Sequence, residues 1–222
     1  MRKLKLMAFV VFISIFCFAQ TDLISPILNE HQFREGDFIF QDLDCDICDA
    51  IEIVTRKISS PYSFSHVALV VKINEQFVAL EAIGDQVQIT SIKEFVNRSK
   101  NEQGQNKIVH ARLKKNFLPL NEKAIAFAKM QIGKPYDDAF TYGQEAYYCS
   151  ELIYDAYQYA QNGKPFFELS PMTFKNPATN TYFDAWIKYY EKLGMPIPEG
   201  APGCNPNGIF EEEKFDVIQA YY

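Results

Sequence analysis

The sequence predicts an α+β fold in which an antiparallel sheet packs against a helix that begins at Cys149. A continuous apolar run at 64–71 is followed by apolar stretches at 76–83 and 86–89, with turn residues between them. This spacing is typical of a three-stranded antiparallel meander. After Cys149, apolar residues recur every three or four positions as far as Ala160. That period predicts a helix with one buried face, from which Glu151 points away.

Two elements are predicted before the meander. A turn at Gly36–Asp37 precedes apolar residues 38–41, which favour a short strand. Residues 50–58 carry apolar side chains at helical spacing, and Ser59, Ser60 and Pro61 end that helix.

After the meander, Ser91 and Glu94 have the spacing of a capping box, which predicts a short helix through Val96. Alternating and periodic patterns indicate the later elements. These are a strand at 107–113, a helix capped by Asn121 and terminated by Gly133, a helix near 183–193 and a long irregular tail.

Composition indicates one globular domain and excludes one class of partner. The chain has 222 residues, of which 48% are hydrophobic and 15% aromatic, enough for a sizeable core. Its formal net charge is −6 and no basic run occurs. Because phosphate binding needs clustered positive charge, we predict no nucleic-acid partner. We expect a monomer.

The start of the chain has the pattern of a secretory signal. Basic residues at 2–5 precede an apolar run at 6–18 and a small residue, Ala19. The run is shorter than the roughly 20 residues of a spanning helix. We predict that 1–19 is a signal peptide, that 20–222 is secreted or periplasmic, and that no stable membrane insertion remains after cleavage. An uncleaved anchor is the alternative.

Cys149 lies where a reactive thiol is favoured. The unpaired N–H groups and the dipole at a helix N-terminus stabilise a thiolate, which is the nucleophilic form. A small buried core residue is the alternative interpretation. Cys45 and Cys48 have acidic neighbours, which disfavour a reactive dithiol, so we predict a structural disulfide within the pair or to Cys204. No second cysteine or histidine pair completes a zinc site, and we predict no metal and no cofactor.

The meander supplies a base and a carboxylate. If Asn74–Glu75 forms a two-residue turn, Ala68 faces Glu81, and His66 and Glu81 project from the same face as diagonal neighbours. Such a pair would orient the imidazole and stabilise its charged form. Together with Cys149, these residues predict an acyl-transfer site in which the amide N–H of Cys149 is one oxyanion donor.

Other assignments remain open at this level. His110 on the later strand is a rival base, and His31 in the lead-in is a weaker one. A one-residue slip in strand register would move Glu81 to the opposite face. A strand histidine can also be a hydrogen-bonded core residue without any catalytic role.

These residues resemble the YiiX-like branch of permuted papain-fold hydrolases, relatives of the NlpC-type cell-wall peptidases. The resemblance implies a circularly permuted papain-like fold, in which the histidine strand precedes the cysteine helix. It also implies that Cys149 is the nucleophile, His66 the base and Glu81 the third polar member. It covers a catalytic core at 36–160 and leaves 161–222 as a C-terminal extension. The matching segments are Gly36–Phe40, Ser65–Leu69, Leu80–Ala82, Gly133–Asp137 and Tyr148–Leu152.

The resemblance implies an exported cysteine amidase or peptidase that acts on a cell-wall peptide or a similar small amide. Two alternatives stand beside it. Related permuted folds move acyl chains of lipids, so an acylated lipid is a second substrate class. The third is a scaffold that binds an envelope ligand without turnover.

Overall fold

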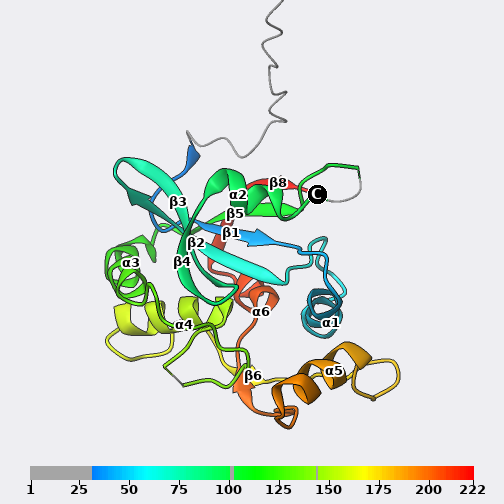
Figure 1. Cartoon of the computed structure of the whole chain (residues 1–222). Helices are drawn as coiled ribbons and strands as arrows, with labels where there is room; N and C mark the ends of the chain where they lie inside the picture. The colour runs from blue at the N-terminus through cyan, green and yellow to red at the C-terminus, as the bar shows by residue number, and fades with distance from the viewer. Residues whose placement is uncertain (1–31, 101–102, 144) are drawn as a thin grey trace, which may run out of the picture.

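A six-stranded antiparallel sheet forms the centre of the molecule (Figure 1). The computed structural model describes residues 32–100, 103–143 and 145–222. The order of strands across the sheet is β4-β3-β2-β1-β5-β8. The strands are β1 (Phe38–Gln41), β2 (His66–Ile73), β3 (Gln76–Ile83), β4 (Gln86–Ser91), β5 (Ile108–Leu113) and β8 (Phe215–Tyr221). The predicted α+β class with an antiparallel sheet is confirmed.

The predicted meander and its register are also confirmed. Ile73 pairs with Gln76 and Leu69 with Leu80, as a turn at Asn74–Glu75 requires. Both turn residues have positive φ, 47° and 65°, which is the backbone of a type I′ hairpin turn. Because pairing continues to this turn, β2 lies two residues later than the apolar run that predicted it.

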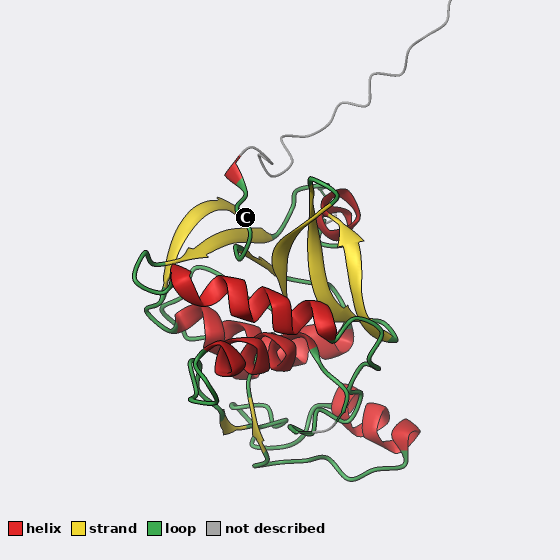
Figure 2. Cartoon of the chain, turned by 90° about the vertical axis from the view of Figure 1, so that its left-hand side faces the viewer, coloured by secondary structure: helices red, strands yellow, loops and turns green. Residues whose placement is uncertain are grey.

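Helices cover both faces of the sheet. Helices α3 (Asn121–Met130) and α4 (Cys149–Ala160) pack on one face, beneath the strands in Figure 2. The short helix α2 (Ile92–Asn97) covers the other face through its apolar residues. As predicted, Ser91 caps α2 by accepting a hydrogen bond from the N–H of Glu94 at 3.2 Å.

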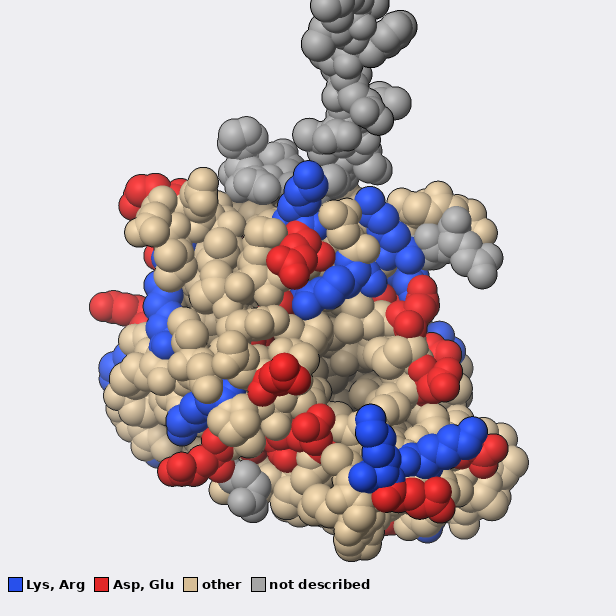
Figure 3. Space-filling view, viewed as in Figure 1, with Lys and Arg blue, Asp and Glu red and all other residues tan. Residues whose placement is uncertain are grey.

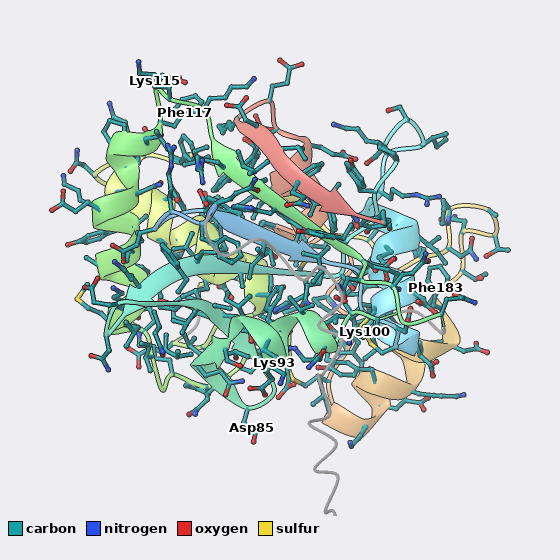
Figure 4. All side chains as sticks on the ribbon, turned by 90° about the horizontal axis from the view of Figure 1, so that it is seen from above. Asp85, Lys93, Lys100, Lys115, Phe117 and Phe183 are labelled. Atoms are coloured by element: carbon teal, nitrogen blue, oxygen red, sulfur yellow. A yellow bond between two sulfur atoms is a disulfide. The ribbon has the colours of Figure 1, made fainter. Side chains whose placement is uncertain are left out.

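A smaller cluster lies at one end of the sheet. Helices α1 (Asp46–Thr55) and α5 (Asp184–Leu193) lie side by side there (Figures 1 and 4). They enclose an apolar group that includes Ala50, Phe174 and Trp186. The two-stranded β6 (Ser170–Pro171) and β7 (Pro202–Gly203) and helix α6 (Pro206–Glu211) connect this cluster to the main core.

Several predicted elements differ from the structure. Helix α1 covers 46–55 rather than 50–58, because Cys45 acts as its N-cap and its Sγ accepts from the N–H of Cys48. The tail predicted to be irregular contains α6 and β8, and β8 pairs with β5 at the edge of the sheet. The segment expected as a C-terminal extension therefore contributes to the central sheet.

Asn121 does not cap α3 as predicted. It is the first helical residue, and its Oδ1 accepts a hydrogen bond from the Tyr157 hydroxyl at 2.8 Å, which ties α3 to α4. The Asn121 side chain also explains why residue 36 is a glycine. Gly36 has φ +83°, and a Cβ there would lie 2.1 Å from Asn121 Nδ2.

The predicted signal peptide at 1–19 and His31 lie outside the described residues. Within the part of the chain that the structure describes, no helix is long and apolar enough to cross a membrane.

Candidate active site

Cys149 is the first residue of α4, as the sequence predicts. Tyr148 is its N-cap and has an extended backbone, so the chain enters the helix directly at the cysteine. The thiol is 6% exposed and lies 4.0 Å from the carbonyl oxygen of Ser65. Since Ser65 immediately precedes β2, the N-terminus of α4 meets the sheet where His66 begins its strand.

Glu151 does not point away from the buried face, as the helical spacing predicted. It is completely buried, and its Oε1 accepts a hydrogen bond from the N–H of Gly143 at 2.9 Å. Burial raises the pKa of Glu151 to about 8, although the N–H groups of Gly143 and Tyr148 act in the opposite direction. Its contacts hold the loop before Cys149 against the first turn of α4.

His66 and Glu81 form the predicted pair on adjacent strands. His66 Nε2 lies 2.6 Å from Glu81 Oε2, and the side chains are 4% and 0% exposed. Burial lowers the pKa of His66, but hydrogen bonds to Cys149 and Glu81 outweigh it and raise this pKa to about 9. The imidazole therefore interacts with both the carboxylate and the thiol, and its raised pKa favours the protonated form at neutral pH.

Glu81 is ionised despite its burial. Burial raises its pKa, but the hydrogen bond to His66, and then the charges of His66 and Arg98, bring the net pKa below the usual value. Arg98, the C-cap of α2, places Nη2 2.7 Å from Oε1 and 2.8 Å from Oε2 of Glu81. Sequence patterns did not identify Arg98, because only packing of α2 on the sheet brings it to β3.

A cavity of about 320 Å³ opens beside Cys149. In Figure 3 a hollow lies beside α1 and above α5, and its walls consist of uncharged residues. The segments that line it come from α1, the residue before β2, the loop before α4, the start of α4, the β6–β7 region, α5 and α6. Its lining residues include Ile51, Val54, Ser65, Tyr136, Phe140, Tyr148, Cys149, Met172, Phe174, Trp186 and Cys204.

With this geometry in place, one comparison decides the family. Residues 32–219 match the family described as permuted papain-like amidase enzyme, YaeF/YiiX, C92 family. The chain belongs to the C92 family. It is therefore a cysteine peptidase or amidase with a permuted papain-like fold.

Individual relatives agree with the C92 assignment. YiiX of Escherichia coli (strain K12), described as an uncharacterized protein, is 26% identical over 199 residues, covering 88% of this chain and 91% of YiiX. The crystal structure of metalloprotein yiiX from Escherichia coli O157:H7 superimposes with a TM-score of 0.67 at 27% identity. That match covers 85% of this chain and 98% of the other.

The description as a metalloprotein applies to the Escherichia coli O157:H7 protein. Across 32–100, 103–143 and 145–222 of this C92 chain, no group of three or more His, Cys, Asp or Glu side chains could hold a metal ion. The described residues therefore do not fit a metal site of that kind. Cys45 and Cys48 form a disulfide with each other, one of the two predicted pairings, and Cys204 is a free buried thiol.

His110 does not occupy the position of the base. Its Nε2 lies 2.7 Å from Asp37 Oδ2, and Arg112 Nε lies 2.6 Å from Asp37 Oδ1. This cluster joins β1 to β5 and is buried, with Phe33 packed against the His110 ring at 4.7 Å. The rival base is thus part of a structural ion cluster.

Arg98 gives a first prediction. In Arg98→Met, Glu81 loses its second partner, and kcat should fall roughly ten- to hundredfold, since a hydrogen bond to a buried charge contributes about 1.5–3 kcal/mol. The pKa of Glu81 should rise. A depressed carboxyl pKa contributes stability that is lost as the pH falls through the folded value, so acid unfolding should move to higher pH.

The matched control is Lys93→Met on the same helix, an exposed residue labelled in Figure 4. Activity and acid unfolding, followed by circular dichroism, should be unchanged in that variant. Equal acid unfolding curves for Arg98→Met and the wild type would show that Arg98 does not position Glu81.

Proposed function

We propose that this chain is an exported hydrolase in which Cys149, His66 and Glu81 cleave an amide bond of a cell-wall peptide or a similar small amide through a thioester acyl-enzyme. The observation that carries this proposal is the buried imidazole of His66, which lies 2.6 Å from the Glu81 carboxylate and interacts with the Cys149 thiol. A histidine with a purely structural role would not need a thiol neighbour that lines a cavity.

The reaction follows from these positions. The Cys149 thiolate attacks the carbonyl carbon, and the electron pair of the C=O bond moves to oxygen. As the C–N bond breaks, the His66 imidazolium gives its proton to the leaving amine. Neutral His66 then takes a proton from water, and the resulting hydroxide attacks the thioester and releases the carboxylic acid, leaving the Cys149 thiolate beside the His66 imidazolium. Glu81 keeps the ring oriented and stabilises its charge.

The developing oxyanion needs two donors. The amide N–H of Cys149, at the free N-terminus of α4, is one. We propose the hydroxyl of Tyr136 as the second. Tyr136 lines the cavity with Cys149, and among the described residues its hydroxyl has no hydrogen-bond partner. Burial raises its pKa well above the usual value, and negative charge on Cys149 contributes to that rise.

Tyr136→Phe should lower kcat by about 10²–10³, the effect of removing one oxyanion donor, with little change in KM. Tyr147→Phe is the matched control. Its hydroxyl contacts Gln131 Oε1 at 3.3 Å and does not line the cavity, so steady-state kinetics should be unchanged. A normal kcat in Tyr136→Phe would assign the second donor elsewhere.

The test of the whole proposal is to trap the acyl-enzyme. After rapid acid quenching of the enzyme with a panel of N-acyl coumarin amides, intact-mass and peptide mass spectrometry should find the acyl group on Cys149. Alkylation of Cys149 by iodoacetamide beforehand should prevent both this adduct and amine release. Amine release that continues after complete alkylation of Cys149 would contradict the proposal.

A further inference from the structure

Resting on the proposed function, we infer that Asn207 is a positioning residue for the reaction, because it fixes where the His66 strand begins relative to Cys149. Asn207 belongs to α6, in the part of the chain that the sequence predicted to be an irregular tail. Its side chain is buried, and it is not among the described residues that line the cavity. Its effect on catalysis therefore passes through other residues.

The Asn207 side chain pairs with both backbone groups of a single residue. Its Oδ1 accepts a hydrogen bond from the N–H of Phe64 at 2.8 Å, and its Nδ2 donates to the carbonyl oxygen of Phe64 at 3.0 Å. A primary amide carries both an acceptor and donors, so it can bond this backbone as a neighbouring strand would. Phe64 is completely buried and lies two residues before His66, the first residue of β2. Asn207 thus fixes the backbone that leads into His66.

The same amide also reaches a second helix. Asn207 Nδ2 donates to the hydroxyl of Thr55, the last residue of α1, at 2.8 Å. Helix α6 lies between α1 and α4 and contacts both, as Figure 1 shows. Three hydrogen bonds to two different segments leave the buried side chain one orientation.

The chain just before Asn207 is bonded to the residues on either side of Cys149. The N–H of Cys204 donates to the Tyr148 hydroxyl at 3.1 Å, and the carbonyl oxygen of Cys204 accepts from the Ser150 hydroxyl at 3.0 Å. These three residues are buried. Both backbone groups of Cys204 are thus paired with side chains at the N-terminus of α4.

Residues 204–207 therefore form a short bridge between the two halves of the site. The start of α4 is bonded to one end, at Cys204, and the entry to β2 is bonded to the other end, at Asn207. Between these ends, the Asn205 side chain caps α6 by accepting from the N–H of Gly208 at 2.7 Å. Because the bridge is short and its turn is capped, it sets the separation between the thiol and the imidazole.

Other contacts tie the same segment to the sheet. The Tyr222 hydroxyl, at the end of β8, accepts from the N–H of Ser63 at 3.2 Å and donates to the carbonyl oxygen of Ser63. The N–H of Ser65 donates to the carbonyl oxygen of Gln41 in β1 at 3.0 Å. Asn207 differs from these partners because the segment that carries it is also bonded around Cys149.

Removal of the amide should be detectable at His66. Asn207→Leu keeps the approximate size of the side chain but leaves the N–H and carbonyl of Phe64 without their partner, so the start of β2 should move until they are paired. Burial lowers the pKa of His66, and hydrogen bonds to Cys149 and then to Glu81 outweigh it and raise this pKa to about 9. As the imidazole moves away from the thiol, the pKa of His66 should fall by about one pH unit.

The experiment compares the full-length wild type with Asn207→Leu. NMR titration of protein labelled with ¹³C-histidine measures the pKa of His66, whose signal is assigned with His66→Gln. This pKa should be about 9 in the wild type and about 8 in the variant. For the N-acyl coumarin amide that the wild type cleaves fastest, kcat should fall roughly ten- to hundredfold with KM unchanged, as a displacement of about 1 Å would cause. Alkylation of Cys149 by iodoacetamide at neutral pH should slow as well.

Asn121→Leu is the matched control. Asn121 is another buried amide, hydrogen-bonded to the Tyr157 hydroxyl at 2.8 Å, and Tyr157 lies about two helical turns along α4 from Cys149. Both leucine variants should melt at a lower temperature than the wild type. Only Asn207→Leu should change the titration of His66 and kcat.

A second variant cuts the bridge at its other end, in case Asn207→Leu does not fold. The double variant Tyr148→Phe with Ser150→Ala removes both side-chain partners of the Cys204 backbone and keeps the apolar packing of the ring. It should lower the pKa of His66 and slow the alkylation of Cys149 in the same direction as Asn207→Leu.

The outcomes separate this inference from the proposed function. If the folded variants keep the wild-type pKa of His66 and the wild-type rate of Cys149 alkylation, Asn207 only stabilises the fold, and the inference is wrong while the thiol mechanism stands. An equal change in Asn121→Leu would overturn it too, because any loss of stability would then have the same effect. If no amide acylates Cys149 in the wild type, the proposed function fails, and the titration and alkylation still decide whether Asn207 sets the spacing of imidazole and thiol.

Discussion

Replacing Cys149 by alanine should reduce amide hydrolysis by at least about 10⁴-fold, because the proposed covalent intermediate forms on its sulfur. Cys149→Ser should be nearly as inactive, although it preserves the size of the side chain. A serine hydroxyl next to a protonated imidazole lacks a base to accept its proton.

Measurements of folding distinguish the loss of activity in these variants from unfolding of the protein. Cys149 is buried at the first turn of α4 and leaves only a small volume when truncated, so both variants should retain the wild-type circular dichroism spectrum and melt cooperatively. Intact mass after quenching should show an acyl adduct for the wild type and none for either variant. Substantial turnover by folded Cys149→Ala would remove the cysteine from the mechanism.

The second large effect is expected for His66. In His66→Gln the thiol loses its neighbouring imidazole and the leaving amine loses its proton donor, so kcat/KM should fall by about 10⁴-fold. The rate of Cys149 alkylation by iodoacetamide near neutral pH should fall with it. Peptide mapping identifies the alkylated residue.

The matched control is His110→Gln, since both histidines are buried and each contacts a carboxylate. That variant breaks the ion cluster with Asp37 and should lower the melting temperature. In the folded fraction, iodoacetamide should alkylate Cys149 at the wild-type rate. If the two variants slow alkylation equally, His66 has no specific role.

His66 also sets the upper pH limit of activity. The pKa of His66 is raised from 6.5 to about 9, so the imidazolium is present at neutral pH and disappears as the pH rises through about 9. kcat/KM should fall over that range. The stability that the raised pKa of His66 contributes is fully present below pH 6.5 and is lost as the pH rises through about 9. Rate profiles and thermal melts between pH 7 and 10.5 measure both effects.

Local patterns determined most of the catalytic geometry. Residue spacing alone predicted the cysteine at the start of α4, and counting back from the turn at Asn74–Glu75 put His66 and Glu81 on one face. Both are short-range statements, because helical period and hairpin register are fixed by residues close together in the chain.

Long-range elements were not predictable in this way. Strand β8 is half-exposed and lacks a clear alternation, and its partner β5 lies about a hundred residues earlier in the sequence. The sequence could not identify Arg98 as the partner of Glu81, because that contact depends on how α2 crosses the sheet. The same holds for Tyr136, whose place in the cavity depends on the loop before α4.

The sequence by itself determined the class of chemistry: a thiol at a helix N-terminus, and a histidine and a carboxylate on paired strands. The tertiary structure alone decided which histidine lies near Cys149, since Asp37 and Arg112 engage His110 while His66 interacts with the thiol. It also decided the character of the cavity, whose wall combines residues of α1 with residues between 170 and 208. The physical reason is that hydrogen-bond register is local, whereas burial and charge pairing depend on segments that meet only in the folded chain.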